Sequence, residues 1–157
     1  MRLKHEGIVL EPSGSDFDVG GSTYGCAFVD EEDPETIYLY YSGARDTRWT
    51  HASIGLSTSR NGRHFTKLTK INPLIDGKNG QFNSKHSITP AVARIDSHYY
   101  MFFAGRSSTL KMLPSGSRIG VAYADDPLGP WEVLGVLKKA KSYWEGWSID
   151  LGPSVVK

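Results

Sequence analysis

The segment Trp144-Glu145-Gly146-Trp147 places a carboxylic acid between two indole rings. Apolar surroundings disfavour the ionised carboxyl group, so they raise its pKa and suit it to donate a proton. A glutamate in a solvated loop would instead be an ordinary surface acid. Two further acids are candidates for the same chemistry: Asp150 follows shortly after Glu145, and Asp18 adjoins Phe17 near the amino end. Asp18 has an alternative role as the side-chain cap of a turn.

Other candidates are cations and aromatic residues that could contact a ligand. Arg45 and Arg106 each follow an aromatic segment, where a guanidinium group could pair with a carboxylate or bridge neighbouring units. His86 precedes an expected strand and is either a ligand-contacting group or a satisfied structural histidine. Trp49, Trp144 and Trp147 fall in expected loops, where an amphipathic ring can stack on a bound molecule.

The elements that must position these residues are repeated along the chain. The aromatic segment 37–45 returns at 98–106, the glycine-containing segment 53–59 returns at 118–124, and the small-residue segment 24–29 returns at 89–94. A third copy of the last segment begins at 151–157. We therefore expect one partial domain over residues 1–157, with repeat units at about 14–70 and 80–136 and a third that starts at 144–157.

Each unit has the pattern of four short antiparallel strands. Aromatic runs bounded by turn residues indicate strands, and no long segment shows a helical period with caps. An all-β fold built from repeated four-stranded sheets is typical of a β-propeller. A β-sandwich is the alternative, but its strands do not repeat their sequence in register. The chain supplies about two and a half blades.

Propellers usually contain about four to eight blades. Two and a half blades would leave aromatic surface uncovered, so we expect either self-association or the remaining blades of a longer chain. Whether Lys157 is a natural end stays open at this stage.

Composition limits the classes of partner. Eighteen Lys and Arg residues balance seventeen Asp and Glu residues, so we expect neither a nucleic-acid nor a membrane partner. We expect no cofactor and no metal, because no phosphate loop or metal-spaced Cys/His set is present. Without an apolar leader in the chain as given, we expect a soluble protein, cytoplasmic in preference to secreted. Cys26, the single cysteine, is expected to be a buried small hydrophobe.

The repeated segments resemble the blades of the five-bladed β-propeller glycosidases. These are the arabinanase and β-xylosidase group and the related invertase and levanase group. The resemblance rests on Thr89-Pro-Ala-Val-Ala-Arg followed by Tyr99-Tyr-Met-Phe-Phe-Ala-Gly, and on Arg118-Ile-Gly-Val-Ala-Tyr-Ala. It extends from about Gly14 to the end of the chain, and it is more specific for the architecture than for any substrate.

The resemblance implies carboxylates at a central funnel, near the inner strands of the first three blades. In such enzymes one carboxylate activates water or attacks, and another donates a proton. It assigns Asp18 as base or nucleophile, with Glu145 and Asp150 as the other catalytic carboxylates. The second blade departs from the pattern, since the segment 84–89 holds His86 in place of an aspartate. Arg106, His86, Trp49, Trp144 and Trp147 are the expected carbohydrate-binding residues.

Three functions follow from these expectations. The first is a glycoside hydrolase-like propeller that acts on a poly- or oligosaccharide. The second is a non-catalytic carbohydrate-binding module, which the missing second-blade aspartate favours. The third is a structural propeller fragment that needs other blades or self-association. The sequence leaves the sugar, the linkage and the retaining or inverting outcome open.

Overall fold

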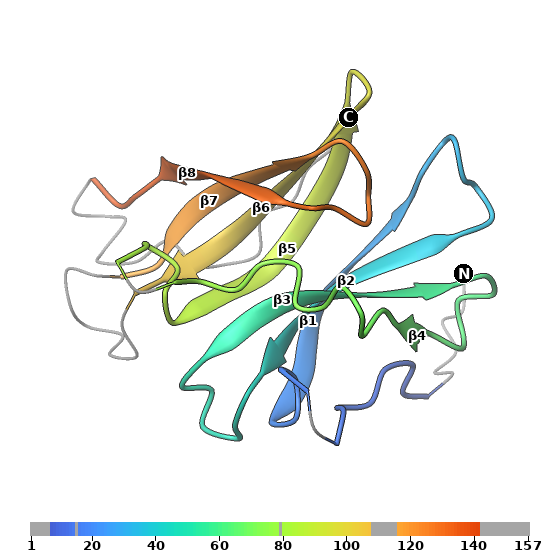
Figure 1. Cartoon of the computed structure of the whole chain (residues 1–157), viewed down its shortest axis with the longest axis horizontal. Coiled ribbons are helices and arrows are strands. Elements are labelled where there is room, and N and C mark those ends of the chain that lie inside the picture. The colour runs from blue at the N-terminus through green and yellow to red at the C-terminus, as the bar shows by residue number, and fades with distance from the viewer. Residues whose placement is uncertain (1–6, 15, 79, 108–115, 142–157) are drawn as a thin grey trace, which may run out of the picture.

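The computed structural model describes residues 7–14, 16–78, 80–107 and 116–141 (Figure 1). Eight strands and no helix occur in these ranges. The strands form two four-stranded units, each in the order inner strand, two middle strands, outer strand. They are β1 (Gly21–Val29), β2 (Ile37–Ala44), β3 (Ala52–Ser59), β4 (Thr66–Lys67), β5 (His86–Ile95), β6 (His98–Arg106), β7 (Arg118–Ala124) and β8 (Glu132–Lys138).

Within each unit, neighbouring strands pair antiparallel, so β1–β4 form the first blade and β5–β8 form the second. A single parallel bridge between Ala52 and His86 joins β3 to β5, and through it the two blades make one continuous eight-stranded sheet. Figure 1 shows the two blades as separate fans of strands, with β5 lying beside the first blade. The expected all-β fold of antiparallel strands is confirmed.

Both inner strands carry a bulge at the same point. The register shifts between Thr23 and Cys26 in β1, and between Ile88 and Ala91 in β5. Within each bulge one residue has a left-handed backbone, Tyr24 at φ 49° and Thr89 at φ 55°. Such backbone is uncommon for residues other than glycine. The Thr89 N–H donates to the buried Ser42 Oγ at 2.9 Å, so the second bulge is anchored to the first blade.

The core lies between the blades because successive residues of a strand face opposite sides of its sheet. On β2 and β3 the apolar residues that alternate toward the second blade are almost fully buried. They pack against residues of β5, β6 and β7 on the face of the second blade that is turned toward the first. The cluster contains Tyr38, Tyr40, Ile54, Leu56, Ile75, Val92, Met101, Phe103 and Ala122. Trp131 packs against this cluster with its ring edge-on to Tyr40.

A phenylalanine covers one face of the two middle strands in each blade. A Cβ on Gly43 or Gly55 would lie 2.4 or 2.3 Å from the Phe17 ring, so the ring rests directly on β2 and β3. A Cβ on Gly120 would lie 2.3 Å from the ring of Phe82, which covers β6 and β7 in the same way. The glycines within the strand patterns therefore mark close approach by an aromatic ring.

The blades are also joined by polar contacts at the end where β1 turns into β2. Asp30 is 3% exposed and accepts hydrogen bonds from the Tyr99 hydroxyl and, at 3.1 Å, from Arg94. Burial raises the pKa of Asp30, but hydrogen bonds from Tyr99, the Glu32 backbone and Arg94 more than offset it and hold the pKa below its usual range. Asp30 is therefore an ionised carboxylate that holds the second blade to the first.

One expectation about the inner strand is wrong. Cys26 lies in β1 as expected, but it is partly exposed and carries a free thiol. The reason is that β1 is an edge strand of the described sheet, and Thr23, Tyr24 and Ala27 of the same strand are exposed as well.

Candidate functional site

One end of the two blades gathers most of the candidate residues. The strands β1 and β5 begin there, and the β2–β3 loop (45–51) and the segment from β4 to β5 pass over it. Antiparallel pairing places the start of β1 beside the end of β2, with Gly21 opposite Ala44. The β3–β5 bridge adds the start of the second blade to the same end. Asp18, Trp49, His86 and Arg106 consequently share this end of the fold.

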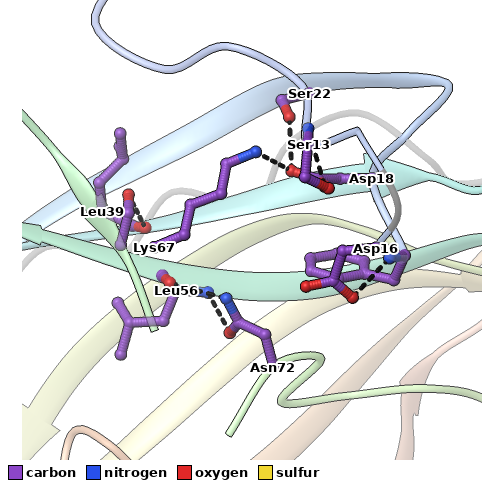
Figure 2. Close-up of polar contacts among 10 residues, drawn as sticks. Ser13, Asp16, Asp18, Ser22, Leu39, Leu56, Lys67 and Asn72 are labelled. Carbon is purple, nitrogen blue, oxygen red and sulfur yellow. Dashed lines mark hydrogen bonds and ion pairs between the residues drawn. The ribbon is translucent and has the colours of Figure 1, made fainter. Parts of the chain in front are cut away.

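Asp18 lies in the turn before β1 and is completely buried. Its carboxylate accepts hydrogen bonds from the Ser22 hydroxyl at 3.0 Å, from the backbone N–H of Ser13 at 3.3 Å and from the Ser13 hydroxyl. Lys67 of the outer strand β4 crosses the sheet to form an ion pair with it (Figure 2). The Lys67 ammonium also lies 5.6 Å from the centroid of the Tyr41 ring.

These partners determine the charge on Asp18. Burial raises the pKa of its carboxyl group, but the hydrogen bonds from Lys67, Ser13 and Ser22 together outweigh burial and leave the pKa below its ordinary value. The group is therefore a fully engaged carboxylate with no exposed surface. A base or nucleophile in hydrolysis must reach water or substrate, so this geometry favours the alternative role of Asp18 in the turn. Its catalytic assignment stays a prediction.

The second blade repeats this turn with different chemistry. Phe82-Asn83 lies 65 positions after Phe17-Asp18, the same spacing that separates Gly55 from Gly120. Asn83 is 1% exposed and donates to the Ser87 hydroxyl at 3.0 Å, as Ser22 bonds to Asp18 in the first blade. Asn83 is thus the structural counterpart of Asp18. Asn83 was not among the residues predicted from the sequence, although the recurrence of Phe followed by a polar residue after 65 positions would have identified it.

The partner of Asp18 changes in the second blade as well. Lys67 pairs with Ser57 on β3, and Val133 pairs with Ala122 on β7 at the equivalent position. Val133 packs against the hydrophobic core. The first blade therefore has a buried carboxylate and an ammonium group where the second blade has an amide and an isopropyl group.

His86 and Trp49 are brought into direct contact. The His86 Nε2–H donates to the backbone carbonyl of Trp49 at 2.6 Å, while Nδ1 is buried with no partner in the described ranges. Burial lowers the pKa of His86, the hydrogen bond to the Trp49 carbonyl partly offsets this, and the nearby charge of Arg106 lowers the pKa further, so the imidazole is neutral near pH 7. The histidine therefore fixes the loop that presents the half-buried Trp49 ring.

Arg106 is 8% exposed and stands opposite His86 in the β5–β6 register. Its Nε–H donates to the Ser117 hydroxyl at 2.9 Å. Arg45, at the equivalent place in the first blade, reaches the Asp76 carboxylate at 2.7 Å. The two arginines thus have different partners in spite of their equivalent positions.

Asp76 is a site residue that sequence reasoning did not single out. It lies in the segment between β4 and β5, and its side chain is 35% exposed. Its Oδ1 accepts from His51 Nε2 and from the Ser53 hydroxyl, both at 2.7 Å. Burial raises the pKa of Asp76, but His51, Ser53 and the charge of Arg45 lower it below the usual range. The sequence repeat did not identify Asp76, because its partners Arg45, His51 and Ser53 lie in a distant segment of the chain.

The remaining candidates, Trp144, Glu145, Trp147 and Asp150, lie outside the described residues. Within the described ranges, no group of three or more His, Cys, Asp or Glu side chains is arranged to hold a metal ion. The same ranges contain no helix with the length and apolar character needed to cross a lipid bilayer.

This all-β arrangement of four-stranded blades matches part of the fold of solved glycoside hydrolase structures. No protein-family profile matches the chain, and no curated protein does.

The similarity appears in solved structures. A family 117 glycoside hydrolase, Zg3597 of Zobellia galactanivorans, superposes with a TM-score of 0.65 at 16% identity over 87% of this chain. An endo-1,4-beta-xylanase of Bacteroides thetaiotaomicron superposes with a TM-score of 0.64 at 17% identity over 89%. An alpha-L-arabinofuranosidase of Clostridium thermocellum gives 0.54 at 18% identity over 75%.

The chain spans less than half of each of these three structures, with 46%, 43% and 36% of their lengths matched in the same order. At these identities the similarity establishes the fold. Function must be argued from the side chains at the site.

Proposed function

We propose that this chain is a glycoside hydrolase-like β-propeller unit that binds a poly- or oligosaccharide at the end where β1 and β5 begin. The single observation that carries the proposal is the convergence of Trp49, His86, Arg106 and Asp76 on that end of a glycosidase-type fold. An aromatic ring beside charged and neutral hydrogen-bonding groups suits a sugar, which has an apolar ring face and a rim of hydroxyl groups.

Binding without hydrolysis is the form of the proposal that we favour. Catalysis would use Asp18, Glu145 and Asp150 as its carboxylates. Of these, Asp18 is buried and paired with Lys67. In addition, the second blade has Asn83 at the position that corresponds to Asp18, and an amide cannot act as an acid or a base there.

A glycan panel tests the proposal. The 157-residue chain is screened by ligand-observed NMR against arabinan, xylan, galactan and fructan oligosaccharides, and each binder is then assayed for release of reducing ends. We expect binding of at least one oligosaccharide without hydrolysis, and weaker binding by Trp49→Ala. Failure of every oligosaccharide to bind would overturn the proposal.

The same screen separates binding from catalysis. Hydrolysis that is abolished by Asp18→Asn, with an unchanged Tm, would establish the enzyme and return Asp18 to the catalytic set. Loss of activity together with loss of the fold would assign Asp18 to the structure of the turn.

A second candidate, a propeller unit that must be completed by further blades or by another copy, is favoured by one face of the second blade. Tyr38, Tyr40, Ile54 and Leu56 of the first blade are buried against the second. Their counterparts in the second blade are still partly exposed, although they are just as apolar. These counterparts are Tyr100, Phe102, Ile119 and Val121.

Light scattering at several protein concentrations tests this second candidate. We expect a concentration-dependent mass that Phe102→Asp lowers toward the monomer. Ile8→Asp is the matched control, because Ile8 is 76% exposed and lies outside both blades. A wild-type mass equal to one chain at every concentration would exclude self-association.

A further inference from the structure

The fold holds an acceptor, Asp76, and a donor, Arg45, side by side next to the β2–β3 loop. The Asp76 carboxylate receives three hydrogen bonds at 2.7 Å, from His51, Ser53 and Arg45. Arg45 and His51 belong to the β2–β3 loop and Ser53 to β3, whereas Asp76 lies in the segment after β4. Its orientation is therefore set by side chains from two different segments.

Both charged groups have hydrogen-bonding capacity left over. An ionised carboxylate offers about four acceptor sites; among the described residues three of those on Asp76 are used, which leaves one site on Oδ2. A guanidinium group has about five N–H donors, and Arg45 uses one of them on Asp76 while its side chain stays 50% exposed. The pKa of Asp76 lies below its usual range, so the carboxylate is charged at neutral pH.

Two other acids at this end differ from Asp76. Asp18 has no exposed surface. The Asp46 carboxylate also accepts three hydrogen bonds, but all of them come from its own loop, from the backbone N–H groups of Arg48 and Thr50 and from the Thr50 hydroxyl.

The loop that carries Arg45 also holds an aromatic residue in a fixed conformation. Trp49 precedes His51 by two residues and has a left-handed backbone, φ 56°. The contact from His86 and a hydrogen bond from the Trp49 N–H to the Asp46 carbonyl at 3.1 Å hold it in this conformation. Its ring stands edge-on to the exposed Tyr24 ring, with 6.4 Å between the centroids. Trp49, Arg45 and His51 are thus all held in place in one loop at this end of the fold.

We propose that Asp76 and Arg45 form a subsite for two neighbouring hydroxyl groups of a neutral sugar residue. One hydroxyl donates to Asp76 Oδ2 and the next accepts from Arg45, which matches the alternation of a vicinal diol. A charge-assisted hydrogen bond is about twice as strong as a neutral one, so the pair selects sugars with adjacent free hydroxyls. This inference rests on the proposed carbohydrate function and identifies the residues that perform it.

The test uses an oligosaccharide that the panel identifies as a ligand, together with its O-methylated derivative. We expect Asp76→Asn and Arg45→Gln each to weaken binding of the free sugar about tenfold or more. We expect O-methylation to weaken wild-type binding by a similar factor. Glu35→Gln is the matched control, because Glu35 pairs with Arg60 at 2.6 Å in an exposed carboxylate–arginine contact at the opposite end of the blade. It should leave affinity unchanged.

A ligand-induced shift of the His51 imidazole resonance gives a second measurement on the wild-type chain, in case Asp76→Asn impairs folding. Oligosaccharide binding that survives both substitutions, with an unmoved His51 resonance, would overturn the subsite and leave the carbohydrate function intact. A wild-type chain that binds no oligosaccharide would overturn both.

Discussion

The ion pair between Asp18 and Lys67 can be replaced by the uncharged residues that the second blade has at the equivalent positions, Asn83 and Val133. Lys67→Val alone would leave a buried carboxylate without its cation, and removing one partner of a buried pair costs about 3–5 kcal/mol. For a chain of this size that corresponds to a fall in Tm of roughly 6–20 °C. Asp18→Asn alone would leave Lys67, whose side chain is 15% exposed, without its carboxylate. We expect it to lower Tm as well.

The double variant Asp18→Asn/Lys67→Val introduces the residue types that the second blade has at the equivalent positions, Asn83 and Val133. We expect it to recover most of the stability lost by either single substitution, because both charges leave the interior together. Urea unfolding of the four proteins, monitored by circular dichroism, gives the coupling free energy directly. Losses that simply add in the double variant would refute the claim that the pair acts as a structural unit.

Two further predictions concern acid and packing. Asp18, Asp30 and Asp76 all have lowered pKa values when folded, so they stabilise the fold above the unfolded-state value, about 3.9, and this stabilisation is lost as pH falls through the folded values. We expect Tm to be flat above about pH 5 and to fall below pH 4; an unchanged Tm at pH 2 would contradict this. Gly120→Ala places a methyl group 2.3 Å from the Phe82 ring, so we expect a loss of about 1–3 kcal/mol. Gly14→Ala, with no atom within 4 Å, is the control and should have no effect in the same thermal melts.

The strands were predictable because the repeat and the alternation of residue types act locally. The segment 37–45 coincides with β2 to within one residue, and 118–124 coincides with β7. The expected outer strand of the first blade is reduced to Thr66–Lys67, since the following residues turn away to carry Asn72 and Ile75 back to β3.

The site was less predictable, for a physical reason. Asp76 meets Arg45, His51 and Ser53 across 31, 25 and 23 residues, through loops that have no counterpart in the repeat. The burial of Asp18 likewise depends on Lys67, 49 residues away. Side-chain type marked Asp18 as an acid, but its exposure is set by a strand on the far side of the sheet.

The blades are fastened to each other along their whole length, and this has a consequence for how they open. At one end Asp30 accepts a hydrogen bond from Arg94. In the middle the Ser42 hydroxyl accepts from the Thr89 N–H, and at the other end the Ala52 N–H donates to the Lys85 carbonyl. Neither blade can separate without breaking all three levels at once. The interface between the two blades is therefore expected to couple their unfolding strongly. Slowly exchanging amide hydrogens of β2 and β6 should be released by a single cooperative opening.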